Sequence, residues 1–278
     1  MGVLKRIFNF YLNSSIHVAL AAYALAWITL IEMNVDYDKS LLSFVFFATI
    51  TGYNFVKYFG IVKFHHQSLA SWLKALQVFS FLAFLAMCYF VLKLEFNALV
   101  LIVILGIITF FYAIPIMVPK QYLFDDHKNL RQVSGLKVYL IALIWMLTTV
   151  LLPMLNNDIV MSPDSVIIGV QRFCYVLVLM LPFEIRDLNY DSLKLATIPQ
   201  KIGVKNTKII GVALLVVFLM LEFFKDELLD VSIIAIVITT IITLVLLLLS
   251  NKNQSKYFSA FWVEGLPIIW LLVLLLLR

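Results

Sequence analysis

Nine stretches of about 20 mainly apolar residues constrain the fold of this chain more than any other feature. They lie at about 15–34, 40–62, 73–92, 97–116, 136–155, 164–184, 207–224, 229–250 and 257–277. A helix of that length crosses a bilayer, whereas membrane-spanning strands would alternate apolar and polar residues. These runs are continuously apolar, and 63% of the 278 residues are hydrophobic. The pattern predicts an all-α fold, a polytopic membrane bundle of about nine transmembrane helices.

The connections between the stretches are short, which predicts a single transmembrane domain over residues 1–278. The segment 1–14 carries Lys5 and Arg6 ahead of the first stretch, and no small-residue cleavage site follows that stretch. We therefore interpret segment 1–14 as an interfacial segment that leads into the first span.

The charges predict an orientation. With the N-terminus inside, most Lys and Arg residues fall in inner segments, and the outer cations are Lys39, Lys93, Lys225 and Arg278. This bias follows the positive-inside rule, so we expect a cytoplasmic N-terminus and an outside C-terminus in an inner (cell) membrane. Basic inner loops also attract anionic membrane lipid. Their scattered charges do not form a nucleic-acid-binding module.

The end of the sixth stretch carries the residues best suited to chemistry. Asp187 and Asp191 are four residues apart and share a helix face if the helix continues through them. Two such carboxylates suit a magnesium ion that also binds substrate phosphates. Nearby cations suited to a diphosphate are Arg186, Lys194, Lys201 and Lys205. Spacing alone favours a solvated helix end with i,i+4 charge pairs over such a site.

This segment, with RDLNYD followed by TIP and IGVKNTK, resembles the second aspartate-rich motif of the UbiA superfamily of intramembrane prenyltransferases. The resemblance implies a UbiA-like fold of nine helices, a site that opens toward the cytoplasm, and magnesium between Asp187 and Asp191 and a polyprenyl diphosphate. It makes these two aspartates the expected catalytic residues. Tyr112 and Pro115 resemble the family's Tyr-Pro step before a basic loop, which here holds Lys120, Arg131 and Lys137.

The first motif of the family, NDxxDxxxD, is degenerate in this chain. The corresponding segment reads GYNFVKYFGIVKFHH, in which Asn54 is kept and the three aspartate positions hold Phe55, Tyr58 and Val62. Half of the expected metal site is therefore missing. Lys57 lies one helical turn from Asn54 and either places a point charge near the diphosphate or extends to the lipid headgroups.

These residues leave two functions open. The first is a UbiA-like prenyltransferase that moves a polyisoprenyl group from its diphosphate to a lipophilic, aromatic or quinone-precursor acceptor. Its expected diphosphate-binding residues are Asn54, Lys57, Lys120, Arg131, Lys137, Arg186, Lys194 and Lys201. The alternative is a catalytically silent member that binds prenyl lipid or acts as a scaffold. A transporter is less favoured, because few charges lie at mid-depth.

Two of those mid-depth charges are Arg172, in the sixth stretch, and Glu264, in the ninth. An intramembrane charge normally faces the bundle interior and finds a partner. We therefore predict an Arg172–Glu264 pair, with Gln171 as a further member, that locks two helices together rather than contacting substrate.

Overall fold

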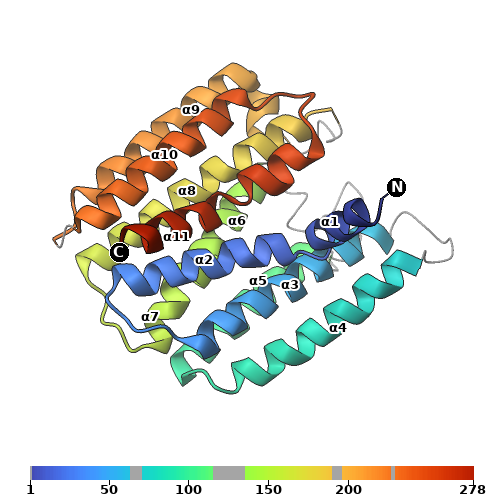
Figure 1. Cartoon of the computed structure of the whole chain (residues 1–278), viewed down its shortest axis with the longest axis horizontal. Coiled ribbons are helices and arrows are strands. Elements are labelled where there is room, and N and C mark those ends of the chain that lie inside the picture. The colour runs from blue at the N-terminus through green and yellow to red at the C-terminus, as the bar shows by residue number, and fades with distance from the viewer. Residues whose placement is uncertain (1, 63–70, 115–134, 190–195, 227–228) are drawn as a thin grey trace, which may run out of the picture.

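The computed structural model describes residues 2–62, 71–114, 135–189, 196–226 and 229–278. Within these ranges the regular structure is helical, as Figure 1 shows. The helices are α1 (Val3–Asn13), α2 (Ile16–Glu32), α3 (Lys39–Val62), α4 (Ser71–Val91), α5 (Phe96–Ala113), α6 (Lys137–Met146), η3 (Leu147–Leu151), α7 (Leu152–Asn156), α8 (Pro163–Asp187), α9 (Ile198–Glu222), α10 (Asp230–Leu249), η5 (Phe258–Val263) and α11 (Leu266–Leu277).

The predicted all-α membrane bundle is confirmed. Seven spans in the described residues are long and apolar enough to cross a membrane, and eight if the bent pair α1 and α2 counts as one span. Helix α3 is not among them, although its 24 residues reach about 36 Å, more than a bilayer core needs. Together with α3, these spans correspond to the nine apolar stretches.

Helix α2 lies at the centre of the bundle and belongs to both of its main cores. On one side it shares a hydrophobic core with α6, α8, α9, α10 and α11, and on the other with α3, α5 and α7. Small side chains such as Ala19, Ala22 and Ala26 are fully or almost fully buried along it. Small residues let neighbouring helices approach closely in a membrane, which explains how one helix serves both halves.

The outer surface of the bundle is apolar. Helix α4 turns Phe81, Leu82 and Leu85 outward, and α5 does the same with Val103 and Ile107. Large exposed apolar surfaces are unusual on soluble proteins but match the hydrocarbon of a bilayer. The chain is therefore an integral membrane protein.

Several membrane-spanning segments, which we call rods, are broken rather than straight. The axes of α1 and α2 differ by 52°, and Ser15 between them has a left-handed backbone conformation, with φ 66°. The fifth and the last membrane-spanning segments each contain a π-helical turn, η3 and η5. A π-helical turn leaves some backbone N–H and C=O groups without their usual helical partners. Inside a membrane, such groups must be buried in protein or line a cavity where they find other hydrogen-bond partners.

Helix α9 begins well before the apolar stretch predicted at 207–224. A capping box formed by Thr197 and Gln200 starts the helix, and Pro199 occupies its first turn. The helix then runs through the polar segment that includes Lys201 and Lys205, with a kink at Gly203, where φ is 79°. Capping, rather than hydropathy, sets this boundary.

Candidate functional site

Many of the described polar residues singled out from the sequence belong to helix ends that gather at the end of the bundle that carries α1, shown at the right of Figure 1. We call it the α1 end. The C-terminal parts of α3 and α8 and the starts of α6, α9 and η5 meet there. The chain thus brings to one end the segments that the resemblance marks as functional.

Asn54 and Lys57 on α3 hold the break between α1 and α2. The Asn54 amide donates to the Ser14 carbonyl at 3.1 Å and to Ser80 Oγ at 2.8 Å, and its oxygen accepts from Ser15 Oγ. Lys57 Nζ donates to Ser15 Oγ at 2.8 Å and to the Asn13 carbonyl at 3.2 Å. The amide hydrogens of Asn54 are therefore used, while two of the three ammonium hydrogens of Lys57 have acceptors among the described residues.

Arg186 and Asp187 form a pair at the end of α8. Arg186 Nε lies 2.7 Å from Asp187 Oδ1, and the guanidinium Nη2 lies 3.1 Å from Oδ2. Both side chains are about a quarter exposed, at 23% and 24%. The same guanidinium lies 5.3 Å from the centre of the Phe183 ring. Asp191 and Lys194 fall outside the described residues.

The start of α9 lies against the entry to α6. Glu184 on α8 is buried and accepts a hydrogen bond from the Ile198 amide at 3.1 Å. A Cβ atom placed on Gly135 would lie 3.5 Å from Lys201 Nζ, so this lysine borders the segment that leads into Lys137. Lys137 and Lys201 thus belong to one side of the α1 end. Lys120 and Arg131, with Pro115, lie outside the described residues.

Glu264 lies at the α1 end and not beside Arg172, so the predicted pair is wrong. Lys57 and Arg186 are the charged groups that interact electrostatically with Glu264. Glu264 also interacts electrostatically with the hydroxyl groups of Tyr11 and Tyr53. All of these belong to the α1 end of their helices. Arg172 lies toward the opposite end, nearer the start of α8, which explains why the two charges do not meet.

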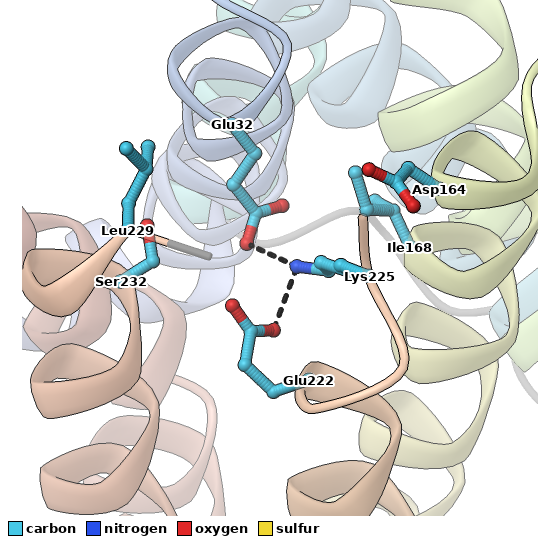
Figure 2. Close-up of a pocket in the computed structure, with 7 residues that line it drawn as sticks. All are labelled: Glu32, Asp164, Ile168, Glu222, Lys225, Leu229 and Ser232. Atoms are coloured by element: carbon cyan, nitrogen blue, oxygen red, sulfur yellow. Dashed lines mark ion pairs between the residues drawn. The ribbon is translucent and has the colours of Figure 1, made fainter. Parts of the chain in front are cut away.

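At that opposite end Arg172 is buried in a different network. Its guanidinium donates to the Leu25 carbonyl at 2.6 Å and to Thr29 Oγ1 at 3.2 Å, and it forms an ion pair with Glu32 at 3.9 Å. Figure 2 shows Glu32 next to Lys225, whose ammonium lies between Glu32 and Glu222. This network joins α2, α8 and the turn after α9.

Gln171 was expected beside Arg172 and Glu264, but it takes part in the same opposite-end network. Its amide donates to Glu222 Oε2 at 3.0 Å and to the Phe218 carbonyl at 3.1 Å. The intramembrane arginine therefore joins α8 to α2, through Leu25 and Glu32, and does not contact Glu264.

Comparisons with known proteins give the fold. No protein-family model matches the chain, and a comparison with curated proteins finds no match. Among solved structures, the apo structure of a UbiA homolog from Aeropyrum pernix K1 matches with a TM-score of 0.68 and 12% identity, over 94% of this chain and 98% of that one. A digeranylgeranylglyceryl phosphate synthase matches with a TM-score of 0.56 and 17% identity, over 98% and 97% of the two chains. The chain has the UbiA fold.

The described part of this UbiA fold does not fit a two-magnesium site. It contains no group of three or more His, Cys, Asp or Glu side chains placed to hold a metal ion. Both oxygens of Asp187 are occupied by Arg186, and Phe55, at the first of the lost aspartate positions, lies 6.4 Å from the Phe110 ring in a stacked arrangement. An aromatic side chain offers no ligand to magnesium.

Sequence reasoning missed the carboxylates of the opposite-end network. Glu32 and Glu222 each stand at the end of an apolar stretch, where a solvated charge is the ordinary expectation. Their side chains are only 6% and 2% exposed. Their partners come from distant parts of the chain, so spacing along the sequence carries no signal of the contact.

Proposed function

We propose that this protein is a UbiA-type membrane prenyltransferase, which moves a polyisoprenyl group from its diphosphate to a lipophilic aromatic or quinone-precursor acceptor. The observation that carries the proposal is the convergence of Lys57, Arg186 and Glu264 at the α1 end of a UbiA fold. One structural relative is named a digeranylgeranylglyceryl phosphate synthase, which supports prenyl chemistry on this fold.

In this proposal cations hold the diphosphate. As the allylic carbon–oxygen bond breaks, negative charge develops on the leaving pyrophosphate, and fixed positive groups stabilise it. Arg186 offers a planar guanidinium and Lys57 offers an ammonium charge. Lys137 and Lys201 border the same end. Lys120, Arg131 and Lys194 remain sequence-based candidates for the same role, and Asn54 acts on this site by holding Lys57 and the α1–α2 break in place.

A single magnesium ion held by Asp187 and Asp191 stays a prediction from the sequence motif. Binding it would require Asp187 to release Arg186, which would free that guanidinium for the diphosphate. The proposal therefore predicts that binding of the diphosphate persists without magnesium, since Lys57 and Arg186 supply positive charge directly.

Binding and turnover of farnesyl and geranylgeranyl diphosphate by the purified protein in detergent test the proposal. We expect Arg186→Met to weaken binding about tenfold to a hundredfold, because a charged hydrogen bond contributes about 1.5–3 kcal/mol. Lys252→Met, which alters an exposed lysine in the turn after α10, is the matched control and should change nothing. Pyrophosphate release with a panel of phenolic acceptors, lost in Asp187→Ala, would support transfer.

The second candidate is a silent member of the fold that binds prenyl lipid without transfer. It is favoured by one observation: Asn54, Lys57 and Phe55, which occupy the first-motif region, are engaged in packing and in holding the α1–α2 break. Retained diphosphate binding with no pyrophosphate release from any donor and acceptor pair would select it. Absence of diphosphate binding would exclude the first candidate.

A further inference from the structure

Glu264 lies where the last membrane rod is broken. The π-helical turn η5 ends at Val263, and α11 begins at Leu266 with Pro267 in its first turn. The Glu264 amide donates to the Ser259 carbonyl at 3.0 Å. Glu264 is thus about seven residues, or roughly 10 Å, into the rod. A carboxyl group at that depth is costly and is normally kept for a purpose.

The Glu264 carboxyl group has unused capacity. Within the part of the chain that the structure describes, it accepts no hydrogen bond and forms no ion pair within 4.0 Å. Its oxygens are nevertheless not fully buried, and the residue is partly accessible. The carboxyl oxygens therefore keep some accessible surface at the α1 end. Glu32 and Glu222, by contrast, are held by Lys225.

Groups from three elements interact electrostatically with Glu264. Tyr53 and Lys57 come from α3, Arg186 from α8 and Tyr11 from α1. On α2, His17 lies behind Gly265, where an added Cβ atom would be 3.2 Å from its Nε2 atom.

The polar groups around Glu264 already have other partners. His17 Nε2 donates to the Phe261 carbonyl at 2.9 Å, so its Nδ1 atom accepts from the Tyr11 hydroxyl at 2.7 Å. Lys57 donates to Asn13 and Ser15, and Arg186 donates to Asp187. Among the described residues, Glu264 is left as a partly accessible acceptor to which no hydrogen-bond donor is bound.

We propose that Glu264 binds the hydroxyl group of the lipophilic acceptor and takes its proton during prenyl transfer. An ionised carboxylate is an acceptor only, so it suits a hydroxyl donor and repels a diphosphate. In the reaction the carbon–oxygen bond of the donor breaks and its electron pair leaves with pyrophosphate. The hydroxyl oxygen of the acceptor forms the new bond to the prenyl carbon, its O–H bond breaks, and that proton goes to Glu264.

The inference rests on the proposed function for its second substrate, but its binding step can be tested alone. The wild-type protein in detergent is treated with dicyclohexylcarbodiimide, a membrane-soluble reagent for carboxyl groups that no cation holds. Labelled residues are then identified by mass spectrometry. We expect label at Glu264 and little at Glu32 or Glu222, which Lys225 holds. Para-nonylphenol should remove most of the Glu264 label, whereas para-nonylanisole, which lacks the hydroxyl hydrogen, should not.

Two results would overturn the inference: a Glu264 side chain that takes no label, or equal labelling with and without the phenol. Farnesyl diphosphate binding is measured on the same preparation. Protection by the phenol without diphosphate binding would refute the proposed transferase and keep the hydroxyl site. Diphosphate binding without protection by the phenol would refute the hydroxyl site at Glu264 and keep the proposed transferase.

Transfer kinetics separate a chemical role from a structural one. We expect Glu264→Gln to lower kcat by about a hundredfold to ten-thousandfold, the usual loss for a general base, with a smaller change in KM. Glu264→Asp should recover part of kcat, and Glu95→Gln, at an exposed site far from the α1 end, should behave as wild type. A Glu264→Gln variant with unchanged kcat would contradict the proton transfer.

Discussion

The ammonium of Lys225 lies 2.6 Å from Glu222 Oε2, and both side chains are almost completely withdrawn from solvent. Glu32 Oε1 lies 3.6 Å from the same nitrogen (Figure 2). Lys225 therefore neutralises carboxylates from two helices that are far apart in the sequence. Removing one member of such a buried set leaves an uncompensated charge and strongly destabilises the protein. Replacing the whole set by apolar residues has a much smaller effect on stability.

The first prediction concerns the removal of that ammonium. We expect Lys225→Met to lower stability by about 3–5 kcal/mol, because Glu222 loses its cation inside the bundle. Thermal unfolding of the purified protein in detergent measures the effect. The double variant Lys225→Met with Glu222→Leu should recover much of the loss.

Lys252→Met provides the control for a lysine that is exposed. It should shift unfolding by less than about 0.5 kcal/mol, as ordinary surface changes do. Equal losses in the Lys225 and Lys252 variants would show that the buried pair contributes nothing specific.

The second prediction is the response of this network to alkaline pH. Burial alone would lower the pKa of Lys225, but the nearby carboxylates of Glu32 and Glu222 outweigh it and raise that pKa. A raised pKa in the folded state gives stability that is fully present below the unfolded value of about 10.4 and is lost as pH rises through the folded value. The stability difference between wild type and Lys225→Met should therefore narrow above about pH 10.5. A difference that stays constant to higher pH would contradict the assignment.

The third prediction separates the observed partner of Arg172 from the one expected from the sequence. In double-mutant cycles, Arg172→Met and Glu32→Gln should couple by about 0.5–3 kcal/mol, because the two side chains form one buried network. Arg172→Met and Glu264→Gln should be additive to within about 0.5 kcal/mol, as expected for distant sites. Strong coupling in the second cycle would restore the pairing with Glu264.

This difference shows where sequence reasoning succeeds and where it stops. Apolar length located the spans closely, since the cost of unpaired backbone in lipid leaves few alternatives. It also placed Arg172 and Glu264 inside the membrane. Apolar length could not identify their partners. The partner of a charged residue depends on its distance from each end of its helix and on which helices pack side by side. Helix α2, which supplies Glu32 to Arg172, gave no such indication.

The candidate site was predicted in part for a similar reason. Motif positions identified Arg186 and Asp187 on α8 and Lys57 on α3, and the fold brings these helices to one end. Local capping, which hydropathy does not register, extended α9 toward the same end. The hydrogen bonds of Asn54 could not be foreseen either, because they join the break between α1 and α2 to α3 and α4.

The fourth prediction follows from those hydrogen bonds. Asn54→Asp should destabilise the protein by about 1–3 kcal/mol, because the Ser14 carbonyl and Ser80 lose their donor. Thermal unfolding in detergent measures the loss. Asn253→Asp, at an exposed turn, is the matched control and should be near neutral. An Asn54→Asp variant as stable as wild type would mean that Asn54 does not hold the α1–α2 break.

The fifth prediction compares two glycines within membrane helices. A Cβ atom on Gly211 would lie 2.6 Å from Leu247 Cδ2 and 2.8 Å from Leu181 Cδ1, so α9 approaches α8 and α10 closely there. Gly211→Ala should cost about 1–3 kcal/mol, the usual range for overpacking a filled core. Gly106, on α5, has nothing within 4 Å of the same position. Gly106→Ala should therefore be neutral or stabilise by up to about 1 kcal/mol through helix propensity.

The thermal unfolding midpoints of the two alanine variants, measured in the same detergent, test whether the close contacts at Gly211 make its substitution more costly than that of Gly106. Opposite or clearly unequal shifts are expected because the substitution is the same and only the surroundings differ. If the Gly211 variant matched the Gly106 variant, the leucine side chains on α8 and α10 would have to rotate away at little cost. The close contact of α9 with both helices would then contribute little to the stability of this half of the bundle.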